Sequence, residues 1–236
     1  MKHERIPNQR VDYQQLLKSI LRLTEVMFIG FASFFVSCKA NEIAKAQLHL
    51  MQAESMPAFH VIERQIPNAD GIIDTHMLII SNESGYLTNY ESEHISFVRI
   101  SYGQRHDCLI PLTGIWRIGF HTQNTTGELE RRGFEGNYSK FRLLFEEASK
   151  ISKEQSPDSY NYIWDYQLET YVKISFYDIT QKPNALYFSL SDNFETSIID
   201  QETYDSLFAT YNALSETCIF DINASSPEDV IQTIFS

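Results

Sequence analysis

The hydrophobic pattern divides the chain into a long helical part and a part made of short strands. Residues 13–56 contain no proline and one glycine, and Ala40, Ala44 and Leu48 recur there at helical spacing. Pro57 ends this pattern, because a proline ring disfavours helical geometry in the residue before it. The sequence therefore predicts one long helix that stops just before Pro57.

After Pro57 the chain has the texture of antiparallel strands. Short runs rich in Ile, Val, Phe and Tyr are separated by polar or glycine-containing turns. Val98, Ile100 and Tyr102 alternate with the residues between them, which is the two-residue period of a strand with unlike faces. The predicted strands lie in AFHVIERQI, THMLIISNES, EHISFVRISYG, DCLIPL and IWRIGFHT.

The second half of the chain mixes a loop, helices and a hairpin. TGELERRGFEGNYS predicts a long polar loop, and FRLLFEEASKISKEQ predicts a helix with one apolar stripe. YVKISFYDITQKPNALYFSLS predicts a β-hairpin with its turn at QKPN. Residues 201–214 and 227–235 predict two further helices, the last of them capped by Ser226 and Asp229.

Together these elements indicate an α+β fold. We expect an N-terminal long (membrane-anchor) helix, followed by a mainly antiparallel β-sandwich or open barrel with peripheral helices. Residues 1–56 would form the tail, the membrane-spanning helix and the juxtamembrane helix. Residues 57–236 would form a β-rich globular domain.

The stretch EVMFIGFASFFVSCKANE decides how the long helix is interpreted. Residues 26–38 carry no charge, yet a bilayer core of about 30 Å needs about 20 helical residues. Widening the window to residues 21–40 reaches that length, with Arg22 and Lys39 near the ends and Glu25 one turn from Arg22. We therefore expect residues 21–40 to contact the lipid bilayer as a single-pass anchor.

Two alternatives to the anchor remain open. Phe35-Val36-Ser37-Cys38 resembles a lipobox, in which Cys38 would be acylated, although the preceding segment is long and the helical pattern continues past it. In a soluble protein this helix would need apolar cover on all sides, and a β domain of this size offers little of it. The N-terminal helices of several copies could provide that cover by packing together in a homo-oligomer.

Charge separates the two parts further. Residues 1–56 hold 7 Lys/Arg and 5 Asp/Glu, and the remaining residues hold 12 and 26. A domain with a formal charge of −14 is repelled by nucleic-acid phosphates, so we expect no nucleic-acid partner.

The unbroken segment CKANEIAKAQLHLMQAESMPAFHV, the strand THMLIISNESG and the later strand residues 175–179 carry a resemblance. The chain resembles a loosely defined group of uncharacterised bacterial single-pass membrane proteins, in which a juxtamembrane helix ends at a proline before a first strand. The likeness covers roughly residues 20–100 and 170–190 and implies an anchored globular domain. It implies no catalytic residue.

Common catalytic signatures are absent. HExxH, GxSxG, GxxxxGK and DxDxDG do not occur, and Cys38, Cys108 and Cys218 form no CxxC pair. These cysteines favour buried free thiols in a reducing compartment, with a Cys108–Cys218 bridge as the alternative. We expect no cofactor, no metal ligand and no catalytic residue identifiable from sequence.

Several weaker sequence patterns are compatible with chemistry. Arg131 and Arg132 lie among three glycines and could bind an anion, but the pattern is more typical of a solvated loop. His106 lies two residues from Cys108, where a buried core cysteine is a better interpretation than a catalytic nucleophile. The four sequons, at Asn82, Asn124, Asn137 and Asn223, favour chance. Acidic residues that could converge only in three dimensions are Glu63, Asp74, Glu93 and Asp178.

The function expected is a membrane-anchored, non-enzymatic interaction or sensor module that binds a protein or small ligand. Such modules could serve in bacterial defence or stress systems. The alternatives are a hydrolase or nucleotide-processing enzyme and a soluble subunit that oligomerises through its N-terminal helices. Basic residues before the anchor place the domain outside by the positive-inside rule, whereas the cysteines, the acidic domain and the resemblance favour the cytoplasm, which we expect.

Overall fold

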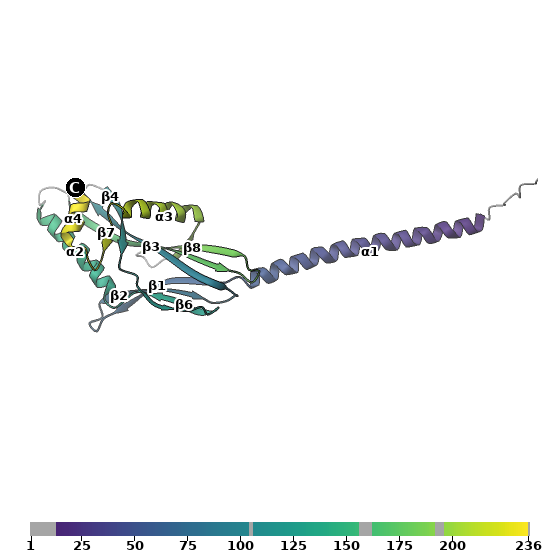
Figure 1. The fold of residues 1–236 in the computed structure, drawn as a ribbon, viewed down its shortest axis with the longest axis horizontal. Helices are drawn as coiled ribbons and strands as arrows, with labels where there is room; N and C mark the ends of the chain where they lie inside the picture. Colours follow the sequence, from purple (N-terminus) through teal and green to yellow (C-terminus); the bar gives the residue numbers. More distant parts are fainter. Residues whose placement is uncertain (1–12, 104–105, 156–161, 192–195, 236) are drawn as a thin grey trace, which may run out of the picture. The chain divides into compact units, whose positions relative to one another are not determined.

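The computed structural model describes residues 13–103, 106–155, 162–191 and 196–235 (Figure 1). By its internal contacts the chain divides after Glu54 into two compact units. The first contains one helix, and the second, Ser55–Ser236, contains every strand of the described chain. The predicted α+β class is confirmed, with a long N-terminal helix followed by two mostly antiparallel open sheets and peripheral helices.

The first unit is the helix α1 (Tyr13–Glu54), which continues through Cys38 without a break. Residues Leu17–Met51 within it are long and apolar enough to cross a membrane, and none of that window is buried against the described chain. Phe28, Phe31 and Phe34 expose 60–77% of their surface. Because so many large apolar side chains lack cover, α1 meets the physical requirement for a membrane anchor or a signal sequence.

The first sheet has four antiparallel strands in the order β1-β2-β6-β5. They are β1 (Phe59–Pro67), β2 (Ile73–Asn82), β5 (Ile118–His121) and β6 (Gly127–Arg132). Asn68 builds the β1–β2 turn, since its side-chain oxygen accepts hydrogen bonds from the backbone N–H groups of Asp70 and Ile72. Val61, Leu78 and Ile80 point inward from this sheet into the core.

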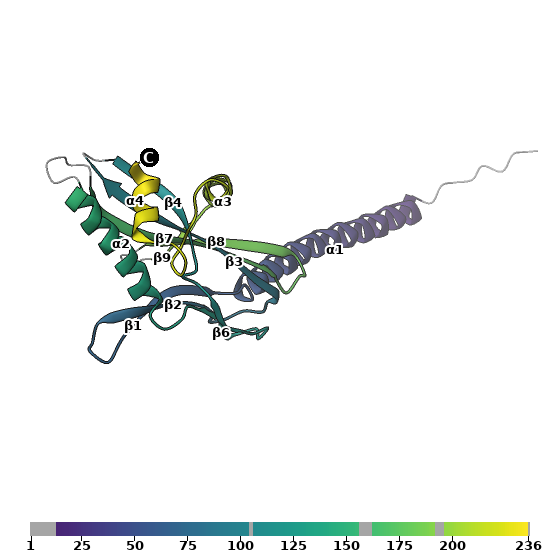
Figure 2. The same cartoon turned by 60° about the vertical axis from the view of Figure 1, so that its left-hand side comes forward.

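The second sheet has six strands in the order β10-β4-β3-β7-β8-β9. They are β3 (Thr88–Tyr102), β4 (His106–Thr113), β7 (Ile163–Tyr177), β8 (Pro183–Ser191), β9 (Thr196–Ile199) and β10 (Phe220–Asp221). Among the described strands only β10 pairs in parallel, with β4. Figure 2 shows the two sheets as separate layers, with β6 and β3 in different ones.

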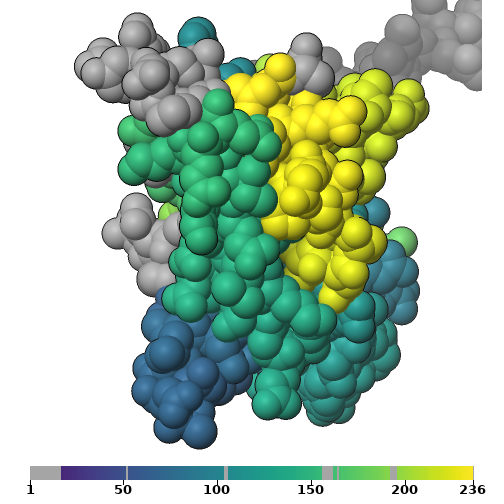
Figure 3. Space-filling view, turned by 90° about the vertical axis from the view of Figure 1, so that its left-hand side faces the viewer, coloured from purple at the N-terminus to yellow at the C-terminus, as the bar shows by residue number. Residues whose placement is uncertain are grey.

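The helices α2 (Asn137–Gln155), α3 (Gln201–Ser215) and α4 (Pro227–Phe235) surround the sheets. Figure 3 shows α2 and α4 side by side over one end of the domain, with the turn between β1 and β2 below them. α2 buries Phe141 and Phe145 against Tyr166 of β7 and also contacts β2, so it bridges the two sheets. α3 covers the other face of the second sheet, where Tyr211 meets Phe97.

The hairpin prediction is confirmed, and its turn is shifted. Val172 opposes Phe188 and Ile174 opposes Leu186 in the β7–β8 register. The turn is formed by residues 178–182 instead of QKPN, because the carboxylate of Asp178 accepts hydrogen bonds from Thr180 and Lys182. These bonds, the side-chain bond from Thr180 foremost, lower the pKa of Asp178 to about 2.

The prediction of a polar loop for TGELERRGFEGNYS is wrong. Residues Gly127–Arg132 form β6, a central strand, and α2 starts at Asn137, earlier than the stripe beginning at Phe141 indicated. The charges of β6 form two ion pairs: Glu128 with Arg131 at 2.8 Å, which is partly exposed, and Glu130 with Arg132 at 2.5 Å, which is largely buried. Pairing lets a charged run enter the middle of a sheet.

Asn137 fastens α2 to the first sheet. Its side-chain oxygen accepts from the backbone N–H of His76 at 2.8 Å, and its amide donates to the carbonyls of His76 and Ile115 at 2.8 and 3.0 Å. Gly133 makes the approach possible, because a Cβ there would lie 2.5 Å from the carbonyl oxygen of His76. Since Asn137 and Asn82 are fully buried, neither sequon offers a glycosylation site in the folded domain.

Replacing Asn137 by Ala should lower the free energy of unfolding by about 3 kcal/mol, because several buried backbone groups lose their partner at once. Urea unfolding followed by tryptophan fluorescence measures this, as both tryptophans lie in the domain. The exposed Asn124 supplies the control, and Asn124→Ala should change stability by less than about 0.5 kcal/mol. Equal effects of the two substitutions would contradict the role given to Asn137.

Candidate functional site

A groove of about 890 Å³ opens between the two sheets of the domain. Its walls come from the first half of β3, from β5 and β6 of the other sheet, and from β7. The groove exists because β4 pairs only with Ser96–Tyr102 of β3, after which the chain crosses to the other sheet and becomes β5. In the described chain, the half of β3 before Ser96 therefore has β7 on one side and no strand on the other.

The carboxylate of Glu130 is the centre of the groove's polar wall. The side chain is 1% exposed, and its Oε2 accepts hydrogen bonds from the hydroxyl groups of Tyr90, at 3.0 Å, and Ser92. Nε of Arg132 lies 2.5 Å from Oε1, and Nδ1 of His121 lies 3.8 Å from Oε2. A buried carboxylate is thus held by two hydroxyls and one guanidinium, which compensates for its lost hydration.

Arg132 also closes part of the free edge of β3. Its Nη2 donates to the hydroxyl of Ser92 at 3.1 Å and to the backbone carbonyl of Ser92 at 3.4 Å. The guanidinium side chain is 11% exposed, so the ion pair with Glu130 lies largely out of water. Arg132 and Glu130 together connect β6 of the first sheet to β3 of the second.

The inner face of β3 is polar along this half and becomes apolar farther on. Tyr90, Ser92 and His94 alternate on the face that looks toward β6, and Ser96 continues the row. Nε1 of Trp116 donates to the hydroxyls of Ser96 and Thr170 at 3.1 and 3.0 Å. The buried tryptophan therefore marks where the polar row meets the apolar core.

Burial changes the acid–base properties of this wall. Desolvation, and then the nearby Glu130 carboxylate, raises the pKa of Tyr90, which keeps its phenol protonated. Desolvation, followed by the charge of Arg132, lowers the pKa of His94 to about 4. His94 is therefore neutral at physiological pH in the folded domain.

Acidification should destabilise the domain through His94. A histidine whose folded pKa lies below the ordinary value of 6.5 takes up protons first in the unfolded chain, so stability falls as the pH falls from about 6.5 to about 4. At 1.36 kcal/mol per pKa unit, the free energy of unfolding falls by about 3 kcal/mol over this range. His94→Gln should remove this part of the acid sensitivity in urea unfolding at pH 7 and pH 4.5, and His106→Gln, at an exposed position, should retain it.

The outer rim of the groove is acidic. Glu93 pairs with Lys173 across the β3–β7 register at 3.0 Å, which leaves both charges balanced. Glu91 also lines the groove and is exposed, and no Lys, Arg or His of the described chain lies within ion-pair distance of it. One carboxylate on the rim is thus available to a ligand.

The acidic residues singled out in the sequence do not converge. Glu63 lies against His76 between β1 and β2, Asp74 accepts a hydrogen bond from Thr75, and Asp178 organises the β7–β8 turn. Only Glu93 reaches the groove. Within the described ranges no three His, Cys, Asp or Glu side chains are placed to hold a metal ion.

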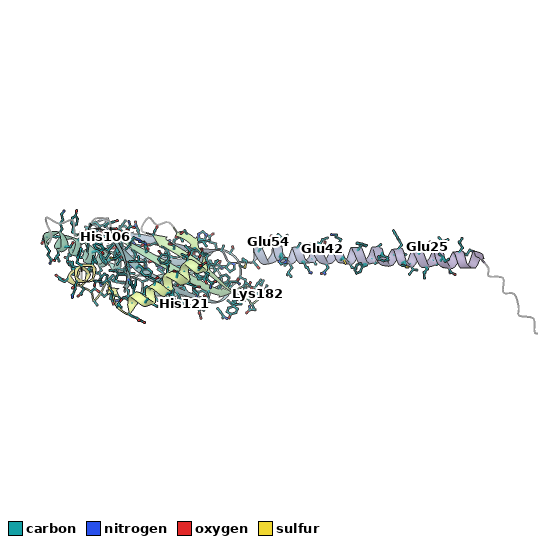
Figure 4. The ribbon with its side chains drawn as sticks, turned by 90° about the horizontal axis from the view of Figure 1, so that it is seen from above. Glu25, Glu42, Glu54, His106, His121 and Lys182 are labelled. Atoms are coloured by element: carbon teal, nitrogen blue, oxygen red, sulfur yellow. The ribbon has the colours of Figure 1, made fainter. Side chains whose placement is uncertain are left out.

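His106 and Cys108 both lie on β4. His106 is at the opposite end of the domain from Lys182 (Figure 4). Cys108 is half-buried instead of fully buried as predicted, and desolvation, followed by the proximity of Cys218, raises the pKa of its thiol to about 11. A raised pKa disfavours the thiolate that a nucleophile requires. Cys108 and Cys218 are free thiols that line one cavity of about 210 Å³.

The groove residues Tyr90, Ser92, His121 and Glu130 were not foreseen from the sequence. The one local signal was the mixture of glutamate and arginine in GELERR, which also fits a solvated loop. Arg131 is exposed and pairs with Glu128, while Arg132 is paired with Glu130, so the weaker alternative of an anion site at these arginines is disfavoured.

The geometry and chemistry of the groove are what indicate a function. The groove offers hydrogen-bond donors, one unpaired carboxylate and a strand edge. Among its described residues no histidine is hydrogen-bonded to a hydroxyl group, since Tyr90 and Ser92 both donate to the carboxylate of Glu130. No protein-family model matches the chain, and no curated protein is significantly similar to it in sequence.

Proposed function

We propose that this protein is a membrane-anchored, non-enzymatic interaction or sensor module whose ligand site is the groove between β3 and β5. The observation that carries the proposal is a solvent-open groove of about 890 Å³ with the buried Glu130–Arg132 pair in its wall. Ligand sites are typically concave and contain a few fixed polar groups. The uncovered apolar surface of α1 supports attachment to a bilayer through residues 21–40.

A hydrolase is less well supported. Hydrolytic sites combine a nucleophile or a water molecule with a base in hydrogen-bond reach. In the described chain the candidate carboxylates occupy separate places, and Glu130 is already engaged by hydrogen bonds from Tyr90 and Ser92 and by its ion pair with Arg132. Binding therefore explains the groove better than catalysis.

Site-specific photo-crosslinking in native membranes tests the interaction role. A benzophenone amino acid at Gln123, an exposed groove residue, should give a discrete adduct, whereas the same probe at Lys150, exposed on α2, should give none. The adduct should disappear when Ile118 at the groove wall is also replaced by Lys. An identical set of adducts from both positions, or none from Gln123, would refute the proposal.

We place the domain on the cytoplasmic side, supported by its acidity and by free thiols at Cys108 and Cys218. Protease added to sealed right-side-out membrane vesicles should then leave a C-terminal tag intact. Cleavage of the tag without detergent would put the domain on the outer side, as the basic residues before the anchor indicate.

A further inference from the structure

Two strand edges that border the groove pair with no other strand of the described chain. One is the outer edge of β5, the last strand of the first sheet, and the other is the half of β3 before Ser96. An uncovered edge offers backbone N–H and C=O groups to an added strand. The groove is therefore bordered by backbone hydrogen-bonding groups as well as by side chains.

The two edge strands of the first sheet, β1 and β5, differ in how well they are protected from pairing with another strand. At β1 the hydroxyl of Thr196 from β9 donates to the carbonyl of Val61 at 2.6 Å, and the strand carries Glu63, Arg64 and Pro67. Charges, proline and a covering segment are the usual means of blocking an edge. β5 has no Lys, Arg, Asp, Glu or Pro, and its Ile118 and Phe120 are 63% and 43% exposed.

Of the two edges beside the groove, β5 is the more available. On β3 the carbonyl of Ser92 already accepts from Arg132, whose side chain stands over that edge. On β5 the backbone hydrogen bonds that flank the strand, from Gly133 to Arg117 and from Thr122 to Leu129, run toward β6. A strand added outside β5 would lie about 4.8 Å away, next to the groove wall that Ile118 and His121 form.

The charge of the groove selects among possible strands. Glu130 and Glu93 are neutralised by Arg132 and Lys173, and Glu91 remains unpaired at the rim. The surrounding domain holds 26 acidic and 12 basic residues after position 56. An approaching cationic segment is attracted, and an acidic segment is repelled.

We propose that the groove binds an extended, positively charged segment of another protein, which adds to the edge of β5 as a further strand and places a Lys or Arg against Glu91. Main-chain hydrogen bonds to β5 would supply affinity, and the Glu91 contact would supply selectivity. This inference rests on the proposed function, because it specifies the ligand of the same groove.

Synthetic peptides test both parts of the proposal with the full-length protein in detergent. The probe is a capped seven-residue peptide of alternating Val and Lys, compared with the same peptide carrying Glu and with a Lys peptide N-methylated at alternate amides. Fluorescence anisotropy should show binding of the Lys peptide, and at least tenfold weaker binding of the other two. N-methylation removes backbone donors and leaves the charge unchanged, so it separates strand pairing from simple attraction.

Protein variants provide the matched controls. Ile118→Lys puts a charge on the β5 edge and should weaken binding at least tenfold, whereas Ile198→Lys, on edge strand β9 outside the groove at 72% exposure, should leave it unchanged. Glu91→Gln should weaken binding about threefold to tenfold and reduce its salt dependence. Unfolding curves followed by tryptophan fluorescence verify that each variant is folded.

Equal binding of the N-methylated peptide, or full binding to Ile118→Lys, would overturn strand addition. Self-association that Ile118→Lys abolishes, measured by sedimentation, would assign the β5 edge to a second copy and would also overturn the proposal. If no basic peptide binds and the Gln123 crosslink persists, the strand proposal fails and the interaction module stands. If the Gln123 crosslink is also lost, both the strand proposal and the proposed interaction module are refuted.

Discussion

Replacing Glu130 by Gln should lower the free energy of unfolding of the domain by about 3–5 kcal/mol. The substitution keeps the shape of the side chain and removes its charge, which leaves the guanidinium of Arg132, 11% exposed, without its counter-ion. The hydroxyl groups of Tyr90 and Ser92 lose a charged acceptor at the same time. Urea unfolding of the full-length protein in detergent, followed by tryptophan fluorescence, measures the loss.

The same strand offers a matched control. Glu128 and Arg131 form an ion pair at 2.8 Å, but their side chains are 31% and 48% exposed, so Glu128→Gln should cost less than about 1 kcal/mol. Replacing both Glu130 and Arg132 by Leu should cost less than Glu130→Gln alone, because no buried charge is left unpaired. A cost for Glu130→Gln as small as that for Glu128→Gln would show that the buried pair contributes little.

Charges at the centre of the apolar segment should release the protein from membranes. Arginine costs about 3 kcal/mol at the middle of a spanning helix, so Phe31→Arg should weaken insertion about 100-fold, and Phe28→Arg combined with it should abolish insertion. Carbonate extraction measures the effect as transfer from the pellet to the supernatant. Because α1 is a separate unit from the domain, these substitutions should not change the free energy of unfolding of the domain.

Arginine in α1 but outside the proposed anchor, residues 21–40, supplies the control for this experiment. Gln47→Arg and His49→Arg lie in the exposed C-terminal part of α1 and should leave the protein in the membrane pellet. Extraction of the unsubstituted chain by carbonate would contradict the anchor. A defined oligomer of that soluble chain in the absence of detergent would then favour packing of the N-terminal helices with one another.

The pattern along the chain was sufficient for elements that depend on near neighbours. α1 follows from an unbroken helical run before Pro57, and the β7–β8 hairpin follows from alternation on both sides of a short turn. Even there the turn centre was misplaced by a few residues, because the hydrogen bonds of the Asp178 side chain decide it. Such bonds depend on the folded backbone and leave little trace in a hydrophobicity pattern.

β6 shows why charged segments resist sequence interpretation. GELERR has one large apolar residue and four charges, which by composition describes a loop. In the folded domain Leu129 enters the core, Glu130 meets Arg132, and the strand lies between β2 and β5. The burial of Glu130 is tolerated because Arg132 of the same strand pairs with it and the hydroxyl groups of Tyr90 and Ser92 reach it from β3.

The sequence by itself determined the division into an apolar helix and an acidic domain, the strand-rich character of that domain and its local hairpin, because these depend on composition and short-range periodicity. Only the tertiary structure decided that β6 is a strand, that β5 is an open edge and that a groove separates β3 from β5. Tyr90 and Glu130, which meet in the wall of this groove, are 40 residues apart in the sequence. Contacts at such separation form only when two sheets stack, and no local pattern encodes which side chains then meet.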